Sequence, residues 1–476
     1  MVYKTNRNLR ANHRFRQDRD RSVKTDLHQR NPRGRRLTIS PIFCSFPRLC
    51  VSQIGQNALY RSIDHTVPVL LEKYPLPTRS AALEQLDQFS PLAGFEYQKW
   101  RNYDFGQHRH TRVSGLSPYI RIGLLNEVEC ARAVLAKLSE AQCRKFLEEL
   151  FWRVYWKGYL ENHPAIWDQY QCDLDSILTI ESLKRKIDAA ESGQTGIDCF
   201  DSWAAELVET GYLHNHARMW FASIWIFTLK LPWQAGAHFF LSHLLDGDAA
   251  TNTLSWRWVA GLHTKGKTYL ARSANIAKYT EKRFSPTGLA SQAAPLAEES
   301  FPLSPHPQAG PFTVCHGSAY GYLFTDDDVS IPDFGDKRPS SALALFPEAR
   351  YARTSASQKV ATFRRASMED TVKRLENQGI PTALVCRNHK DAVGDWIIQN
   401  QFDTIVSPQP YVGDWNNDWP EIDASIGAHG ATLRLFRRWW EAELFPRATK
   451  GFFNLKKHLP TVWARIRAYK ESDPLL

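Results

Sequence analysis

The sequence has 476 residues, 43% of them hydrophobic, which is enough to build two domains that each have a core. Residues 1–50 hold 13 Lys or Arg against three Asp or Glu, an excess equal to the net charge of the whole chain (+10). The remainder is therefore neutral, and a uniformly basic surface for nucleic acid is excluded.

Two further classes of site are excluded by composition. The eight cysteines form no CxxC pair, so neither zinc nor an iron–sulfur cluster has its usual ligand spacing. No apolar run reaches the roughly 18–20 residues of a membrane helix. We expect a cytoplasmic protein with reduced cysteines, no metal and no membrane contact.

Along the chain, residues 1–55 are polar and Arg-rich, and we predict a basic, disordered tail, although contact with phosphates stays open. Residues 56–290 show apolar residues at helical spacing, for example Val128, Ala131 and Leu135. Ser139 and Gln142 have the capping-box spacing that opens a helix. The pattern predicts an all-helical domain over 56–290.

The pattern changes after a linker at 291–311 that is rich in Ala, Ser and Pro. Short apolar runs at 342–346, 382–386, 404–407 and 432–436 predict buried strands. Helical segments at 358–378, 390–401 and 420–428 alternate with them. Such alternation is typical of a parallel sheet, so we predict a smaller Rossmann-like α/β domain over 312–476.

Two tempting motifs are interpreted as chance matches. Gly261 to Thr268 fits the phosphate-binding P-loop pattern, but the stretch before it is short and rich in Trp, not an apolar strand. The pairs His108/His110 and His214/His216 suggest metal ligands. The two members of each pair are two residues apart, a spacing that places their side chains on different faces of a helix, so we do not expect them to bind a metal.

One stretch points to a bound ligand. Arg218 lies in an otherwise apolar helix and needs a buried partner, for which Asp246 and Asp248 are the natural candidates. Several Trp surround these charges in the sequence. A charged cluster walled by Trp suits a large planar ligand such as a flavin, although a purely structural ion pair in a helical bundle is the simpler alternative.

This stretch resembles the FAD-binding domain of the DNA photolyase and cryptochrome family. The order and spacing of eight residues follow the family pattern: Asn215, Arg218, Trp233, Asp246, Asp248, Asn252, Trp256 and Trp258. Upstream, Ser114 to Tyr119 resembles the family's TSxLSPYL phosphate loop, and Glu149 to Arg153 resembles its E-L-x-W-R helix. The resemblance covers about residues 90–290.

The resemblance implies FAD as cofactor. Tyr103, Ser114, Ser117 and Arg153 would hold the diphosphate region, and Leu116 would also bind the cofactor. Arg218 and Asp246 would pair beside the isoalloxazine, Asp248 would lie at its polar edge, and Asn252 would face its N5 atom. The antenna chromophore is not identified.

The resemblance also implies UV-damaged DNA as the partner of a monomer. The residues expected to bind a flipped cyclobutane dimer are Glu149, Trp152, Asn215, Met219 and Trp258. Those expected to take part in catalysis or electron transfer are Glu149, Trp152, Asn252, Trp233 and Trp256. Trp152 and Trp258 would stack on the bases, and Glu149 would hydrogen-bond to them.

The sequence departs from the family pattern at several positions. Val113 stands where the phosphate loop has Thr, and Leu254-Ser255 replaces Gly-Gly. The outermost Trp of the electron-transfer chain falls near Ile180, so an exit through Trp167, Trp203 or Trp225 is considered. The α/β domain follows the helical domain, whereas it precedes it in photolyases.

We therefore predict light-driven repair of cyclobutane pyrimidine dimers by electron transfer from reduced FAD. A blue-light photoreceptor without repair activity is the main alternative. A helical flavoprotein that binds DNA without repairing it is a third.

Overall fold

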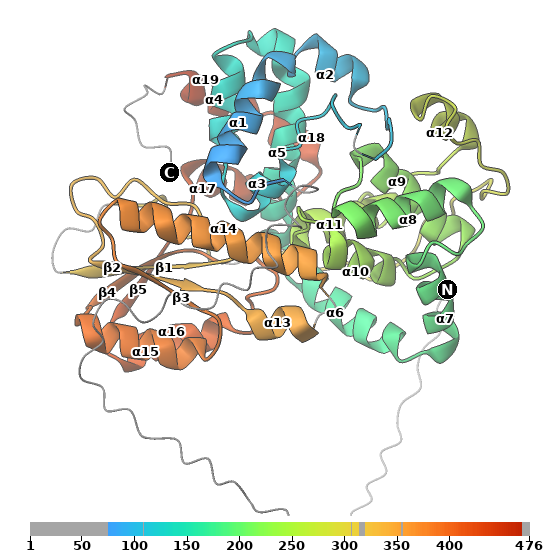
Figure 1. Cartoon of the computed structure of the whole chain (residues 1–476). Coiled ribbons are helices and arrows are strands. Elements are labelled where there is room, and N and C mark those ends of the chain that lie inside the picture. The colour runs from blue at the N-terminus through green and yellow to red at the C-terminus, as the bar shows by residue number, and fades with distance from the viewer. Residues whose placement is uncertain (1–74, 108, 306, 314–318, 354–355, 469–476) are drawn as a thin grey trace, which may run out of the picture. The chain divides into compact units, whose positions relative to one another are not determined.

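The computed structural model describes residues 75–107, 109–305, 307–313, 319–353 and 356–468. The predicted tail at 1–55 lies outside these residues. Within the described residues, helices come first along the chain, and the five strands lie between residues 320 and 436 (Figure 1).

Helices before the sheet begin with α1 (Arg79–Phe89), η2 (Ser90–Leu92), α2 (Phe95–Trp100), α3 (Ser117–Ile122), α4 (Glu127–Leu135), α5 (Glu140–Asn162), α6 (Ala165–Leu178) and α7 (Glu181–Glu191). They continue with α8 (Asp198–Thr210), α9 (Asn215–Ser223), the π-helical turn η3 (Ile224–Thr228), α10 (Trp233–His243), α11 (Ala249–Val259) and α12 (Ser273–Tyr279). The predicted capping box is confirmed, because the Gln142 side chain accepts a hydrogen bond from the Ser139 N–H (2.9 Å) at the start of α5.

The five strands are parallel and lie in the order β3-β2-β1-β4-β5. They are β1 (Tyr320–Thr325), β2 (Ser341–Leu345), β3 (Thr382–Val385), β4 (Thr404–Pro408) and β5 (Thr432–Phe436). The four predicted strands correspond to β2 to β5. The central strand β1 was not predicted, and its buried run of aromatic and aliphatic residues is the signal that identifies it.

Helices cover both faces of the sheet. Figure 1 shows α14 (Gln358–Asn377) on one face, with α15 (His389–Asn400) and α16 (Trp419–Ala428) on the other. The short helix α13 (Glu348–Arg353) follows β2. A separate apolar cluster, which includes Leu323, Trp396 and Ile426, fills the layer under α15 and α16.

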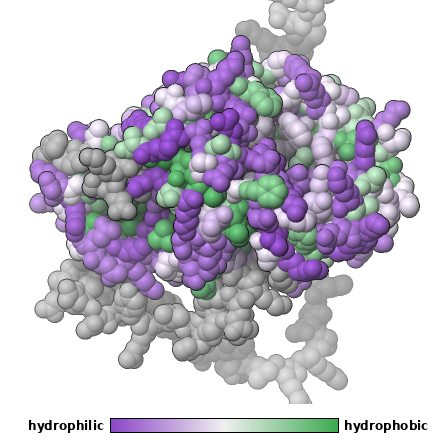
Figure 2. All heavy atoms as spheres, turned by 90° about the horizontal axis from the view of Figure 1, so that it is seen from above, coloured by the Kyte–Doolittle hydropathy of each residue, from purple (hydrophilic) through white to green (hydrophobic). Residues whose placement is uncertain are grey.

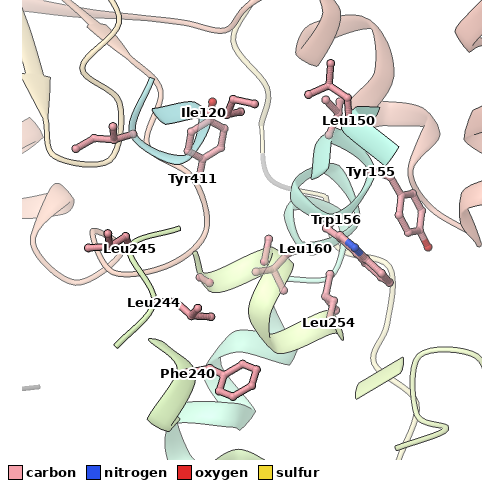
Figure 3. Packing of buried hydrophobic residues seen from close by; sticks show 14 of the residues in the cluster. Ile120, Leu150, Tyr155, Trp156, Leu160, Phe240, Leu244, Leu245, Leu254 and Tyr411 are labelled. Atoms are coloured by element: carbon pink, nitrogen blue, oxygen red, sulfur yellow. The ribbon is translucent and has the colours of Figure 1, made fainter. Parts of the chain in front are cut away.

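The helices after β5 return to the first part of the chain. They are α17 (Trp439–Leu444), η4 (Phe445–Arg447), α18 (Phe452–Lys456) and α19 (Leu459–Ala468), and they pack against α4 and α5. One hydrophobic cluster therefore includes residues from both ends of the chain. In Figure 3, Tyr411 from the loop after β4 lies in the same cluster as Ile120 of α3 and Leu160 of α5.

The P-loop-like stretch does not have the structure of a phosphate-binding loop. Gly261 to Gly266 form turns directly after helix α11, with no strand before them. The interpretation of this motif as a chance match is confirmed by its surroundings.

The surface seen in Figure 2 is largely hydrophilic, with hydrophobic residues in small scattered groups. Among the helices that the structure describes, none combines the length and apolarity needed to cross a membrane.

Gly158 on α5 allows η4 to approach this helix closely. A Cβ at this position would lie 2.9 Å from Phe445 Cα and 2.8 Å from Phe445 Cδ1. We expect Gly158→Ala to lower the free energy of unfolding by about 1–2 kcal/mol, because overlap with backbone outweighs the gain in helix propensity.

Gly427→Ala on α16 is the matched control, since a Cβ there meets nothing within 4 Å. Its stability should be unchanged or higher by up to about 1 kcal/mol in urea unfolding. A Gly158→Ala protein as stable as the wild type would contradict the close approach of η4.

Candidate functional site

An ion pair between α5 and α11 lies at the centre of the site. Arg153 Nη2 is 2.9 Å from Asp248 Oδ2, and the two side chains are 11% and 6% exposed. Asp248 also caps α11, because its Oδ1 accepts a hydrogen bond from the Thr251 N–H (2.7 Å). The aspartate therefore fixes the start of α11 relative to α5.

The charge state of Asp248 follows from its neighbours. Burial alone would raise the pKa of this carboxyl, but Arg153, Arg121 and Lys157 lower the pKa to about 2. Asp248 is thus a carboxylate at neutral pH and presents negative charge to the site.

A second ion pair confirms the partner expected for Arg218. Its Nη2 donates to Asp246 Oδ2 (3.0 Å), and its Nε donates to the Leu213 carbonyl (2.8 Å). Asn252, one turn into α11, donates from Nδ2 to the Ala237 carbonyl (2.8 Å). The amide of Asn252 is therefore held in one orientation between α10 and α11.

The phosphate-loop candidate forms a turn before α3. Gly115 has φ +64°, which favours glycine, and the Leu116 N–H donates to Ser114 Oγ (3.4 Å). Gln85 of α1 donates to the Ser114 carbonyl (2.9 Å), and Ser117 begins α3. Val113 lines a cavity of about 480 Å³ beside this loop, together with Gln85, His110, Glu206 and Tyr212.

Tyr103 lies in an aromatic group with Trp100, Phe105 and Tyr279. A second tyrosine, Tyr97 on α2, lies near Glu149 and was not considered in the sequence analysis. Burial raises its pKa, and the negative charge of Glu149 raises it further. Its position four residues before Arg101 is the available signal, because that spacing places the two side chains on one side of α2.

The residues expected to bind substrate come from three helices. Glu149 lies on α5, where it pairs with Arg101 (2.9 Å) and Lys145 (2.8 Å). One turn later, the partly exposed Trp152 stacks on Phe452 with ring centroids 3.9 Å apart.

The other three expected substrate residues lie on α9 and α11. Asn215 is the exposed first residue of α9, and Met219 follows it on the same face of that helix. Trp258, near the end of α11, stacks on Tyr269 at 5.8 Å. Trp152 and Trp258 thus make separate ring contacts in the described part of the chain.

Each of the two inner Trp contacts further aromatic rings. Trp256 is buried and packs edge-to-face with Trp225 at 6.1 Å. Trp233 stacks on Tyr170 at 5.7 Å, and Tyr170 contacts Trp167 at 5.2 Å. Ile180, at the family's outer Trp position, is 45% exposed.

One cluster of possible metal ligands was not predicted. Asp104, His110 and Glu206 bring ligand atoms within 4.8 Å of one another. Asp104 already accepts hydrogen bonds from Arg283 (2.7 Å) and from the Trp203 indole (3.0 Å), and the Arg283 charge opposes a cation. His108, the other member of that His pair, lies outside the described residues.

Comparison with known proteins is consistent with this geometry. Residues 146–289 match the family model described as the FAD binding domain of DNA photolyase. They belong to the photolyase and cryptochrome family. The description of this model supports FAD as the cofactor.

Curated relatives with the name deoxyribodipyrimidine photo-lyase include one from Synechococcus sp., which is 31% identical over 191 residues. That match covers 39% of each chain. The protein from Streptomyces griseus is 35% identical over 153 residues, covering 32% of this chain and 33% of its own. The match thus spans about two fifths of the length of the first of these relatives and less of the second.

Solved structures similar to this chain include a class III photolyase from Agrobacterium tumefaciens, with 23% identity and a TM-score of 0.39. The match covers 45% of this chain and 46% of the photolyase chain. A cryptochrome from Synechocystis sp. has 23% identity and a TM-score of 0.38, covering 44% of this chain and 45% of its own.

The residues present fit FAD by one structural criterion. Two buried polar atoms at the site, Asp246 Oδ1 and Arg153 Nε, make no hydrogen bond within the described part of the chain. Such atoms are costly unless a ligand or water satisfies them. Arg153 would hold the diphosphate, and Asp246 and Asp248 would bind the polar edge of the flavin.

Replacing Asp248 tests this arrangement. Asp248→Asn keeps a side chain that can cap α11 but removes the carboxylate 2.9 Å from Arg153, which is left with the more distant carboxylate of Glu127 (3.9 Å). We expect the free energy of unfolding at pH 7 to fall by about 3–5 kcal/mol. Asp395→Asn, an exposed carboxyl on α15, is the control and should change stability little.

The pH dependence of the same variant is a separate test. The pKa of Asp248 in the folded protein (about 2) lies below its ordinary value of 3.8. The stabilisation it provides is therefore complete above about pH 4 and is lost as the pH falls toward 2. In urea unfolding, the difference between wild type and Asp248→Asn should shrink over this interval, and a constant difference would contradict the assignment.

Proposed function

We propose that this protein repairs cyclobutane pyrimidine dimers in DNA in a light-driven reaction that depends on FAD. The observation that carries the proposal is the arrangement on α5. Glu149, Trp152 and Arg153 lie within about one turn, and Arg153 reaches Asp248 on α11. One helix therefore joins the residues expected to touch substrate to those expected to hold cofactor.

Each residue has a defined part in the proposed reaction. Trp152 and Trp258 offer aromatic faces to a flipped dinucleotide, which offsets the loss of base stacking in DNA. Glu149 would accept hydrogen bonds from the thymine edges, and its pairing with Arg101 and Lys145 holds the carboxylate in place. Bound FAD in its reduced form would supply the electron under blue light.

The chain's own residues prepare the site for that chemistry. Arg218 and Asp246 neutralise each other inside the protein, so their charges are available for hydrogen bonding without an unpaired buried charge. Asn252 is held by the Ala237 carbonyl and would present a neutral amide toward the flavin. We also propose that the protein acts as a monomer in the cytoplasm and that it needs no metal ion.

A photoreceptor without repair activity is the second candidate. Val113 in place of the loop Thr and the exposed Ile180 at the outer Trp position favour it, since both change how the cofactor is held or reduced. The aromatic series Trp233, Tyr170 and Trp167 offers another exit for electrons, which keeps photoreduction compatible with either function.

Repair of a defined substrate separates the two candidates. Protein that is chemically reduced under anaerobic conditions would be mixed with single-stranded DNA carrying one thymine dimer. We expect loss of the dimer in light and not in the dark. Chemical reduction removes the aromatic series from the question, because no electron then needs to enter through it.

Trp152→Ala should lower the affinity for this DNA about tenfold or more, as base stacking on an aromatic ring contributes about 1–3 kcal/mol. Flavin absorbance would confirm that the variant still binds cofactor. Wild-type protein with bound, reduced FAD that leaves the dimer intact would exclude repair and favour the photoreceptor.

A further inference from the structure

Helix α18 brings an aromatic side chain from the far end of the chain to the expected substrate site. The rings of Phe452 and Trp152 stack nearly parallel, with centroids 3.9 Å apart and planes 14° apart. Phe452 also meets Tyr155 on α5 at 5.7 Å. The position of Trp152 is therefore set from a segment 300 residues away in sequence.

The segment that carries Phe452 is anchored on both sides. Lys456 Nζ pairs with Glu148 of α5 at 2.8 Å. On the other side, Asn162 at the end of α5 donates to the Phe445 carbonyl (2.7 Å), and η4 packs closely over Gly158. Phe452 itself is only 3% exposed, which is typical of a core residue rather than of a mobile lid.

Trp152 stays partly exposed although one of its faces is covered. A base can therefore stack only on the part of the indole that Phe452 leaves free. Two rings in van der Waals contact also restrict rotation of the indole about its side-chain bonds.

We propose that Phe452 is a positioning residue, which holds the indole of Trp152 in the orientation that stacks on a base of the damaged DNA. This inference rests on the proposed function. Phe452 would not touch the substrate. It would raise affinity because Trp152 loses less conformational freedom when DNA binds.

Three variants of the full-length FAD-bound protein test the proposal. Phe452→Leu keeps an apolar side chain but removes the ring, and Phe452→Tyr keeps the ring. Phe453→Ala is the matched control, because Phe453 is next to Phe452 in the sequence but is 74% exposed. Melting temperature and flavin absorbance would be measured for each, to show that the fold and the cofactor are retained.

Affinity is measured in the dark with single-stranded DNA that carries one thymine dimer, against the same DNA without damage. We expect Phe452→Leu to bind the damaged DNA about two- to tenfold more weakly, the range set by the strength of aromatic pairs. Phe452→Tyr should bind within twofold of the wild type, and Phe453→Ala should be unchanged. Repair at saturating DNA should be unchanged in Phe453→Ala.

Unchanged affinity in Phe452→Leu would overturn the proposal, and so would tighter binding, which would mean that Phe452 blocks the ring. A second measurement needs no DNA. With fluorinated tryptophan, the Trp152 resonance, assigned by Trp152→Phe, should broaden or shift in Phe452→Leu and not in Phe453→Ala.

These two measurements also separate the inference from the proposed function. Wild-type protein that binds damaged and undamaged DNA equally would overturn the proposed function and the role of Phe452 in affinity. A fluorine resonance that does not change in Phe452→Leu would overturn the positioning of Trp152, whatever the protein binds.

Discussion

The buried pairing of Arg153 with Asp248 is the interaction on which the rest of the site depends. Charges this far from water are stable only when opposite charges compensate them, so α5 and α11 are held at the distance that the pair requires. The positive charge of Arg121 on α3 also lowers the pKa of Asp248. Arg121 in turn pairs with Asp327 after β1 (3.0 Å). The geometry of the expected flavin edge is thereby linked to the sheet.

The sheet contributes to the site through its loops rather than through a ligand of its own. Its strand order reverses between β1 and β4, the place where open α/β sheets commonly bind ligands. Here charged side chains occupy that place. Asp328 pairs with Arg438 (2.8 Å), and Glu161 of α5 pairs with Arg437 (3.2 Å).

A cavity of about 10 Å³ lies there, and it is lined by Lys157, Asp248 and Tyr411 among others. This is room for about one water molecule. The position used elsewhere for a nucleotide thus serves here as the contact between the sheet and the helices that carry the expected cofactor site.

The features that sequence alone could predict are those with a local physical cause. A charged Arg218 in an apolar helix requires a partner, and the aspartate that completes the pair lies where the next helix ends. Buried strands were predicted from apolar runs, whereas β1 was missed because it follows an irregular segment and contains Gly321.

Contacts between distant segments leave no local signal. Nothing around Phe452 in the sequence indicates Trp152 as its neighbour, and nothing around Asp327 indicates Arg121. These pairings depend on how α17 to α19 return across α5, which is a property of the whole fold.

That return has a consequence for how the protein is made. The ribosome synthesises α5 long before α17 to α19, yet these helices cover one side of α5 in the finished fold. During synthesis the apolar face of α5, including Trp152, stays exposed or makes temporary contacts until about 300 more residues have left the ribosome. The apolar face of α5 can therefore be covered by these helices only at the end of synthesis.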